Sequence, residues 1–238
     1  MIEHPQFTRR ALLVWQSPLG SSVRRDRHAV AELVQAEDRL EFRYLDDARL
    51  EAARLAGFTI YPGLPLNSTQ LDRIAEEVLI RRLPPRDRED FDHCLGRFGL
   101  PPNDEYPALT LLAYTGARLT GDSFSVCETF DGFEPPFTYV FDVAGRRHYQ
   151  ERYNQLCSGE PLVLEREPNN SHDPDAIRIA RADGACVGYV NRLQTGAVGR
   201  WLDGCGISAS VFRANGRRDY PRLFVLAEIG KGSVSLAA

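Results

Sequence analysis

Lysine is almost absent from this 238-residue chain, in which Lys231 stands against 28 arginines. A mechanism that needs a lysine at a phosphate or in a Schiff base is therefore excluded from the front part, although arginine can supply phosphate contacts. The signatures G-x-S-x-G, H-E-x-x-H and G-x-x-x-x-G-K-S/T do not occur, and no spacing of His, Asp or Glu suggests a metal site. We therefore expect a protein without catalytic activity of its own and without a cofactor.

Paired cysteines and long apolar runs are also lacking. No apolar run approaches the ~20 residues that span a bilayer, and the start, MIEHPQFTRRALLVWQ, has no apolar segment followed by a cleavage site. We expect a cytoplasmic protein. An odd number of cysteines without a C-x-x-C pair argues against a zinc site or a disulfide framework and predicts buried free thiols. The five are Cys94, Cys127, Cys157, Cys186 and Cys205.

The charge is distributed unevenly along the chain. Residues 1–141 hold 16 arginines and 22 acidic residues, whereas the remainder holds 13 basic and 11 acidic residues. The segment ETFDGFEPPF at residues 128–137 contains paired prolines and a glycine, which is typical of a linker. We expect two domains, residues 1–130 and residues 131–238, that meet different partners.

The front part has the pattern of a small sheet with helices. Leu40, Phe42 and Tyr44 alternate strictly with polar residues, which indicates a half-buried strand, and the segments 11–15 and 28–35 predict two more. Apolar faces and capping residues predict helices from Ala48 to Ala56, from Ser68 or Thr69 to about residue 82, from Asp87 to about residue 98, and from about residue 105 to 114.

The back part contains many short strands. Asp183-Gly184 lies between two alternating runs and predicts a hairpin. Further strands are expected at 137–142, near residue 165, at 207–212 and at 223–229, with a short helix at 193–202. This pattern favours a small closed or nearly closed β-barrel. The whole chain is therefore expected to be α+β.

A polar loop at residues 167–175 precedes the hairpin. Such a cluster beside rigid strands is typical of a binding site, but it is equally typical of an Asx-turn network that closes its own loop. Both interpretations remain open from the residues alone. The cluster consists of Asn169, Asn170, Ser171, His172 and Asp173.

Three motifs, in order and spacing, resemble those of the HIRAN domain. They are VAGRRHY at residues 143–149, EPNNSHDPDAI at residues 167–177 and CVGYV at residues 186–190. The resemblance covers residues 137–229. It implies a β-barrel that binds nucleic acid, since known members include one that binds single-stranded DNA at a free 3′ end.

The resemblance also implies roles for individual residues. Arg147 and Arg192 would contact backbone phosphates, because a guanidinium fork matches phosphate oxygens. Asn169 and Asn170 lie on the loop that would hold the terminal nucleotide. Asp173 would meet the 3′-hydroxyl, since a carboxylate accepts a hydrogen bond from a hydroxyl and repels a phosphate.

Aromatic positions depart from the family pattern. His148 and His172 stand where the relative has tyrosines, while Tyr149 keeps the second aromatic. Stacking on an aromatic contributes roughly 1 to 3 kcal/mol per base, so these replacements predict weaker binding. Tyr220, beside several arginines in a late loop, is a candidate replacement.

Each candidate has a structural alternative. Asp173 could be a turn former, His148 and His172 could be surface residues, and Arg147 could pair with Asp142 or Glu165.

The front part resembles the N-terminal subdomain of HipA-type kinases. The segments YPGLPLNS, LIRRLPPR and TGARLTGDSFSV carry the resemblance, through their order and spacing. The catalytic core of that family is absent. The resemblance implies a lobe that docks a partner protein and has no kinase activity.

Two functions follow. The first is a non-catalytic adaptor that binds single-stranded DNA or 3′ ends through residues 131–238 and docks a kinase, nuclease or helicase through residues 1–130. The second is an interaction module of toxin–antitoxin type that binds a HipA-like kinase and has little affinity for DNA; the two histidine replacements and the net charge of −4 favour it. A binding surface for another ligand, such as a modified nucleotide, is a third possibility.

Overall fold

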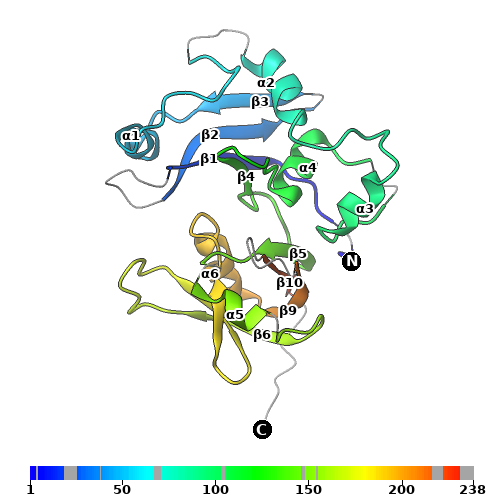
Figure 1. The fold of residues 1–238 in the computed structure, drawn as a ribbon, viewed down its shortest axis with the longest axis vertical. Coiled ribbons are helices and arrows are strands. Elements are labelled where there is room, and N and C mark those ends of the chain that lie inside the picture. Colours follow the sequence, from blue (N-terminus) through cyan, green and yellow to red (C-terminus); the bar gives the residue numbers. More distant parts are fainter. Residues whose placement is uncertain are drawn as a thin grey trace. The chain divides into compact units, whose positions relative to one another are not determined.

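The computed structural model describes residues 1–3, 5–18, 26–37, 39–66, 71–102, 105–145, 148–153, 155–215 and 222–230, without the side chains of residues 71–73 and 150. The chain is a mixed α+β protein of two compact units (Figure 1). The N-terminal unit is Phe7–Phe133, and the C-terminal unit combines Met1–Gln6 with Glu134–Ala238. The first six residues lie with the C-terminal unit because Gln6 and Glu134 exchange two hydrogen bonds, of 2.6 and 3.0 Å.

An antiparallel four-stranded sheet in the order β3-β2-β1-β4 organises the N-terminal unit. The three predicted front strands are confirmed. Apolar side chains of the strands, such as Leu13 and Leu33, pack with Leu79 and Leu112 from the helices to form the core. The elements are β1 (Arg10–Gln16), β2 (Arg27–Gln35), β3 (Leu40–Tyr44), α1 (Ala48–Leu55), α2 (Leu71–Ile80), α3 (Phe91–Gly96), α4 (Ala108–Thr115) and β4 (Phe124–Glu128).

Helix starts are the weaker part of the sequence prediction. α3 begins at Phe91, so the predicted start at Asp87 is wrong; the residues between them form turns after Pro84-Pro85. α4 begins at Ala108, because Pro107 before it has extended backbone (φ −55°, ψ 151°). The proposed caps of α2 and α4, residues 68–69 and 103–104, lie outside the described residues.

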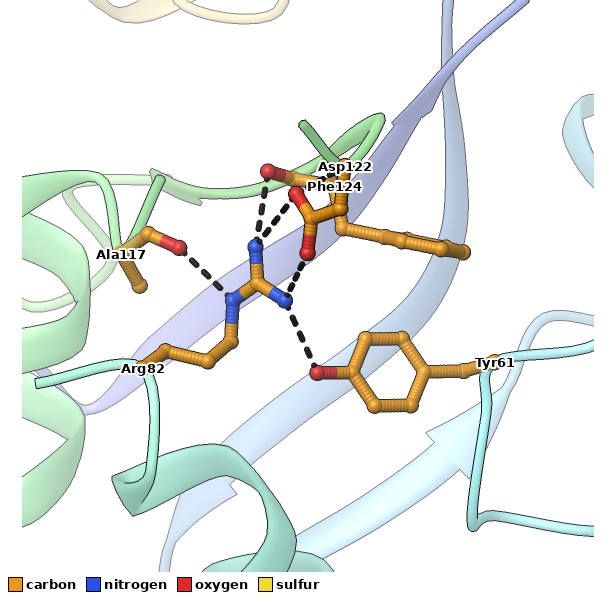
Figure 2. Close-up of polar contacts among 5 residues, drawn as sticks. All are labelled: Tyr61, Arg82, Ala117, Asp122 and Phe124. Atoms are coloured by element: carbon orange, nitrogen blue, oxygen red, sulfur yellow. Dashed lines mark hydrogen bonds and ion pairs between the residues drawn. The ribbon is translucent and has the colours of Figure 1, made fainter. Parts of the chain in front are cut away.

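A buried arginine ties the loops of the N-terminal unit together (Figure 2). Arg82 follows α2, and its side chain is 3% exposed. Its guanidinium forms a two-pronged ion pair with Asp122, with N–O distances of 2.6 and 3.0 Å. It also donates to the carbonyls of Ala117 (2.7 Å) and Phe124 (3.0 Å) and to the Tyr61 hydroxyl (3.0 Å). The charge is buried with partners on every nitrogen, which is the condition for burying it at all.

A curled, antiparallel six-stranded sheet forms the C-terminal unit, in the order β5-β10-β9-β6-β7-β8. Its two edge strands meet at one point: Ala144, just beyond β5, and Tyr189 of β8 exchange backbone hydrogen bonds of 2.8 and 3.1 Å. The prediction of a nearly closed barrel is therefore confirmed. The elements are β5 (Phe137–Asp142), α5 (Gln150–Tyr153), β6 (Pro161–Arg166), β7 (Ile177–Arg181), β8 (Cys186–Tyr189), α6 (Thr195–Gly204), β9 (Ile207–Ala214) and β10 (Leu223–Ile229).

Gly188 permits this closure. It has a φ of +146°, and a Cβ atom there would lie 2.3 Å from Val143 Cγ1 and 2.6 Å from the Ala144 carbonyl oxygen. Real Cβ atoms essentially never approach so closely. The glycine of the CVGYV motif is thus required where the two edge strands cross.

The cysteines are all unpaired. Only Cys127 is buried and Cys157 is exposed, so the prediction of buried thiols is wrong for four of the five. Within the described part of the chain, no helix is both long and apolar enough to cross a membrane. Among the same residues, no group of three His, Cys, Asp or Glu side chains is arranged to hold a metal ion.

Candidate nucleic-acid interface

Asn170 organises the polar loop between β6 and β7. Its Oδ1 accepts hydrogen bonds from the backbone N–H groups of His172 (2.9 Å) and Asp173 (3.2 Å). Its Nδ2 donates to Oε2 of Glu167 at 2.6 Å. These are the bonds of the Asx-turn interpretation, so Asn170 shapes the loop with the polar atoms that the sequence also offered to a ligand.

Asp173 uses its two carboxylate oxygens differently. Oδ1 accepts from the backbone N–H of Asp175 at 3.0 Å. Oδ2 lies 3.4 Å from Nε of Arg192. The Asp173 side chain is 18% exposed and that of Arg192 is 73% exposed. The fold therefore brings a half-satisfied carboxylate beside an accessible guanidinium, from positions 19 residues apart.

Two tyrosines continue the site from the loop onto the barrel. The Tyr189 hydroxyl donates to Oε2 of Glu167 at 2.9 Å, and the Tyr149 ring lies 6.2 Å from the Tyr189 ring at an angle of 54°. Hydrogen bonds from Asn170 and Tyr189 lower the pKa of Glu167, which keeps it ionised. Burial raises the pKa of both tyrosines, so their hydroxyls remain protonated donors.

The comparison with known families decides the nature of this unit. Residues 136–226 match the family model of the HIRAN domain. We refer to them as the HIRAN domain from here on. The match includes the loop, the hairpin and the barrel closure, and it confirms that part of the sequence prediction. It lies outside the N-terminal unit, for which the resemblance to HipA-type kinases stays an expectation.

Two solved structures resemble the chain in part. A protein from Lactobacillus plantarum is 22% identical, with a TM-score of 0.32, over 38% of this chain and 91% of that one. The HIRAN domain of human HLTF is 22% identical, with a TM-score of 0.31, over 38% of this chain and 74% of that one. No curated protein matches the sequence.

The remaining predicted residues of the HIRAN domain fall into two groups. His148, Asn169 and His172 are exposed, and the His148 ring lies 6.3 Å from that of Tyr149. Arg147 and Tyr220 lie outside the described residues. The structure thus joins Tyr149, Asn170, Asp173 and Arg192 through shared contacts.

Ion pairs bear on the alternative offered for Arg147. Asp142 binds Arg222, with an Nη2–Oδ2 distance of 3.1 Å, and Glu165 binds Arg178 at 2.5 Å. Both acidic residues that the sequence offered to Arg147 therefore have other arginine partners.

Sequence reasoning missed Tyr189 and Glu167 as site residues. Tyr189 contacts Tyr149, bonds Glu167 and closes the barrel through its backbone. The available signal was its position as the last residue of β8, directly after a glycine that crosses another strand. Glu167 was readable only as the first residue of the polar loop.

Proposed function

We propose that this protein is a non-catalytic adaptor whose HIRAN domain binds single-stranded DNA and recognises its 3′ end. The family match supports DNA binding as the domain's activity. The observation that carries end recognition is the pair of Asp173 and Arg192, in which Oδ2 of the carboxylate lies 3.4 Å from an exposed guanidinium. This pair offers an acceptor for a hydroxyl and a donor for a phosphate side by side.

The division of labour follows from the bonds of each group. Oδ1 of Asp173 is held by the N–H of Asp175, so Oδ2 is the oxygen that accepts from the 3′-hydroxyl. Arg192 is long and exposed, and it can turn its fork to the phosphate on the 5′ side of the same nucleotide. A terminal phosphate in place of the hydroxyl would bring two anions together at Asp173. Asn170 and Glu167 hold the loop, and Tyr149 offers a stacking surface.

Fluorescence anisotropy with short single strands tests the proposal. The wild type should bind a strand with a free 3′-hydroxyl more tightly than the same strand with a 3′-phosphate. Two unit charges 4 Å apart in water repel by about 1 kcal/mol, so the preference should be roughly 5-fold or more. Binding should also weaken as salt rises.

Asp173→Asn is the informative variant, because an asparagine Oδ1 can still accept from Asp175 while the charge is lost. It should reduce the preference towards unity. Asp175→Asn is the matched control. Asp175 is exposed and lies two residues after Asp173, so this variant removes an equal charge nearby and should leave the preference unchanged. Equal binding of both strands by the wild type would refute end recognition, and no binding at low salt would refute DNA binding.

The N-terminal unit is proposed to dock a partner protein. Its sequence resemblance to a HipA subdomain supports this role, which co-purification with a kinase, nuclease or helicase would test. The alternative of a toxin–antitoxin-type module is supported by exposed histidines at positions 148 and 172, where stacking tyrosines would favour DNA. Stable co-elution with a HipA-like kinase, together with no binding of DNA at low salt, would establish that alternative.

A further inference from the structure

Arg152 lies at the tyrosine end of the site, on the short helix α5. Its backbone N–H donates to the carbonyl of Tyr149 at 3.0 Å, a bond that closes a turn between the two residues. Its guanidinium carbon lies 5.6 Å from the centre of the Tyr149 ring, and Nη1 donates to the carbonyl of Cys186. The residue is exposed. Its charged group is therefore anchored by an aromatic ring and a strand carbonyl.

Unlike several other arginines of the HIRAN domain, Arg152 has no carboxylate partner among the described residues. Among the described residues of the HIRAN domain, Arg152 has no carboxylate within ion-pair distance, and its hydrogen bond to Cys186 occupies one of five donors. Five other arginines of the domain are paired: Arg166 with Asp203, Arg178 with Glu165, Arg181 with Glu160, Arg192 with Asp173 and Arg222 with Asp142.

A series of contacts connects Arg152 to the polar loop at residues 167–175. Arg152 touches Tyr149, Tyr149 touches Tyr189, and Tyr189 bonds Glu167 of the loop. A strand whose 3′ end lay at Asp173 and that followed these contacts would reach Arg152 after the tyrosine pair. The guanidinium is already fixed there, so a phosphate would bind without the full entropy cost of ordering a free side chain.

We propose that Arg152 is a second phosphate-binding residue, which holds a backbone phosphate on the 5′ side of the one held by Arg192. The site then takes more than the terminal nucleotide and measures a minimum length of single strand. This inference rests on the proposed function and adds a subsite to it. The guanidinium of Arg152 covers one side of the Tyr149 ring, and a base can stack on that guanidinium in turn.

A ladder of oligonucleotides from two to six residues, all with a 3′-hydroxyl and no 5′-phosphate, tests this subsite. Arg152→Ala should bind the dinucleotide as the wild type does, because that ligand carries a single phosphate for Arg192. For the longer strands it should bind roughly tenfold more weakly, as expected for a lost hydrogen bond to a charged group. The salt slope, log K against log salt, should fall by about 0.7 for one lost phosphate contact on a single strand.

Two further variants sharpen the result. Arg152→Lys keeps the charge but loses the fork, so it should retain the salt slope while binding more weakly. Arg43→Ala removes an exposed arginine of β3 in the N-terminal unit and should change neither quantity. The proposal would be overturned if Arg152→Ala kept the salt slope of the wild type, or if it lost as much affinity for the dinucleotide as for the longer strands.

The preference for a 3′-hydroxyl separates this inference from the proposed function. If Arg152→Ala keeps that preference and loses only the gain with length, the subsite is established. If it loses the preference as well, Arg152 acts by positioning Tyr149 and the loop, and the subsite is wrong. If the wild type shows no preference, end recognition fails first, and the gain with length alone then decides whether Arg152 contacts a phosphate.

Discussion

Replacing the buried Arg82 of the N-terminal unit should lower the stability of that unit far more than replacing a surface arginine. In Arg82→Met the apolar stem is kept, while the carbonyls of Ala117 and Phe124 and the hydroxyl of Tyr61 lose their donor (Figure 2). The guanidinium donates to three uncharged acceptors, and the loss of each of these bonds costs about 1 kcal/mol. The Asp122 side chain is 31% exposed, so water can solvate it once its partner is gone. We therefore expect a loss of about 3 kcal/mol.

Asp122→Ala should be at least as damaging as Arg82→Met. It leaves the guanidinium, which is 3% exposed, without its counter-charge, whereas the reverse change leaves a charge that solvent can reach. Loss of one partner from a buried pair typically costs about 3 to 5 kcal/mol. The order of the two variants follows from which partner is buried.

Urea unfolding followed by tryptophan fluorescence can measure this. The chain has two tryptophans, Trp15 in the N-terminal unit and Trp201 in the C-terminal unit, so a Trp201→Phe background reports on Trp15 alone. The control is Arg88→Ala, which breaks a pair with Asp90 whose side chains are 56% and 46% exposed and should cost no more than about 0.5 kcal/mol. A loss below about 1 kcal/mol for Arg82→Met would refute the reasoning.

Two more outcomes are expected. Gly188→Ala should destabilise the HIRAN domain and abolish DNA binding, because its Cβ would lie 2.3 Å from Val143. Gly184→Ala is the control: this residue has a φ of +82° with open space around it, so the variant should lose only about 1 kcal/mol of stability. Similar unfolding curves for the two variants, followed by Trp201 fluorescence, would contradict this expectation. Burial raises the pKa of Glu128 from 4.5 to about 7, so the folded protein holds an extra proton between these values and its stability falls as pH rises through that window. Glu128→Gln should flatten a slope that amounts to roughly 3 kcal/mol in full, and an unchanged dependence in urea unfolding between pH 5 and 8 would exclude Glu128 as its source.

Local periodicity predicted β3 because its buried residues alternate with more exposed ones. Leu40, Phe42 and Tyr44 show the period of two that a half-covered strand requires, and β3 spans these residues. The end of the predicted helix at Ala56 is also encoded locally, because the next residue, Gly57, has a φ of +101°, a conformation that favours glycine. The start of α3 was predicted wrongly because residues 86–90 have helix-compatible side chains but form turns. The pattern of side chains does not distinguish a helix from a series of turns in this segment.

The site was predictable where a motif holds its own loop together. Asn170 and Asp173 cap neighbouring N–H groups within three residues, so their spacing is set locally. The pairing of Asp173 with Arg192 depends instead on the hairpin folding back. The family resemblance assigned both residues to the nucleic-acid site but did not predict that they pair. Tyr189 was missed because its role comes from the meeting of two sheet edges, which no local pattern encodes.

The strand order of the barrel has a consequence for synthesis. β5, the first strand of the HIRAN domain to leave the ribosome, pairs with β10, the last, across the register Phe137↔Ile229 to Asp142↔Phe224. Until β10 is made, β5 lacks its neighbour in the sheet. Because such long-range pairing forms slowly, we expect the proposed nucleic-acid site to be complete only after the final strand of the domain has been made.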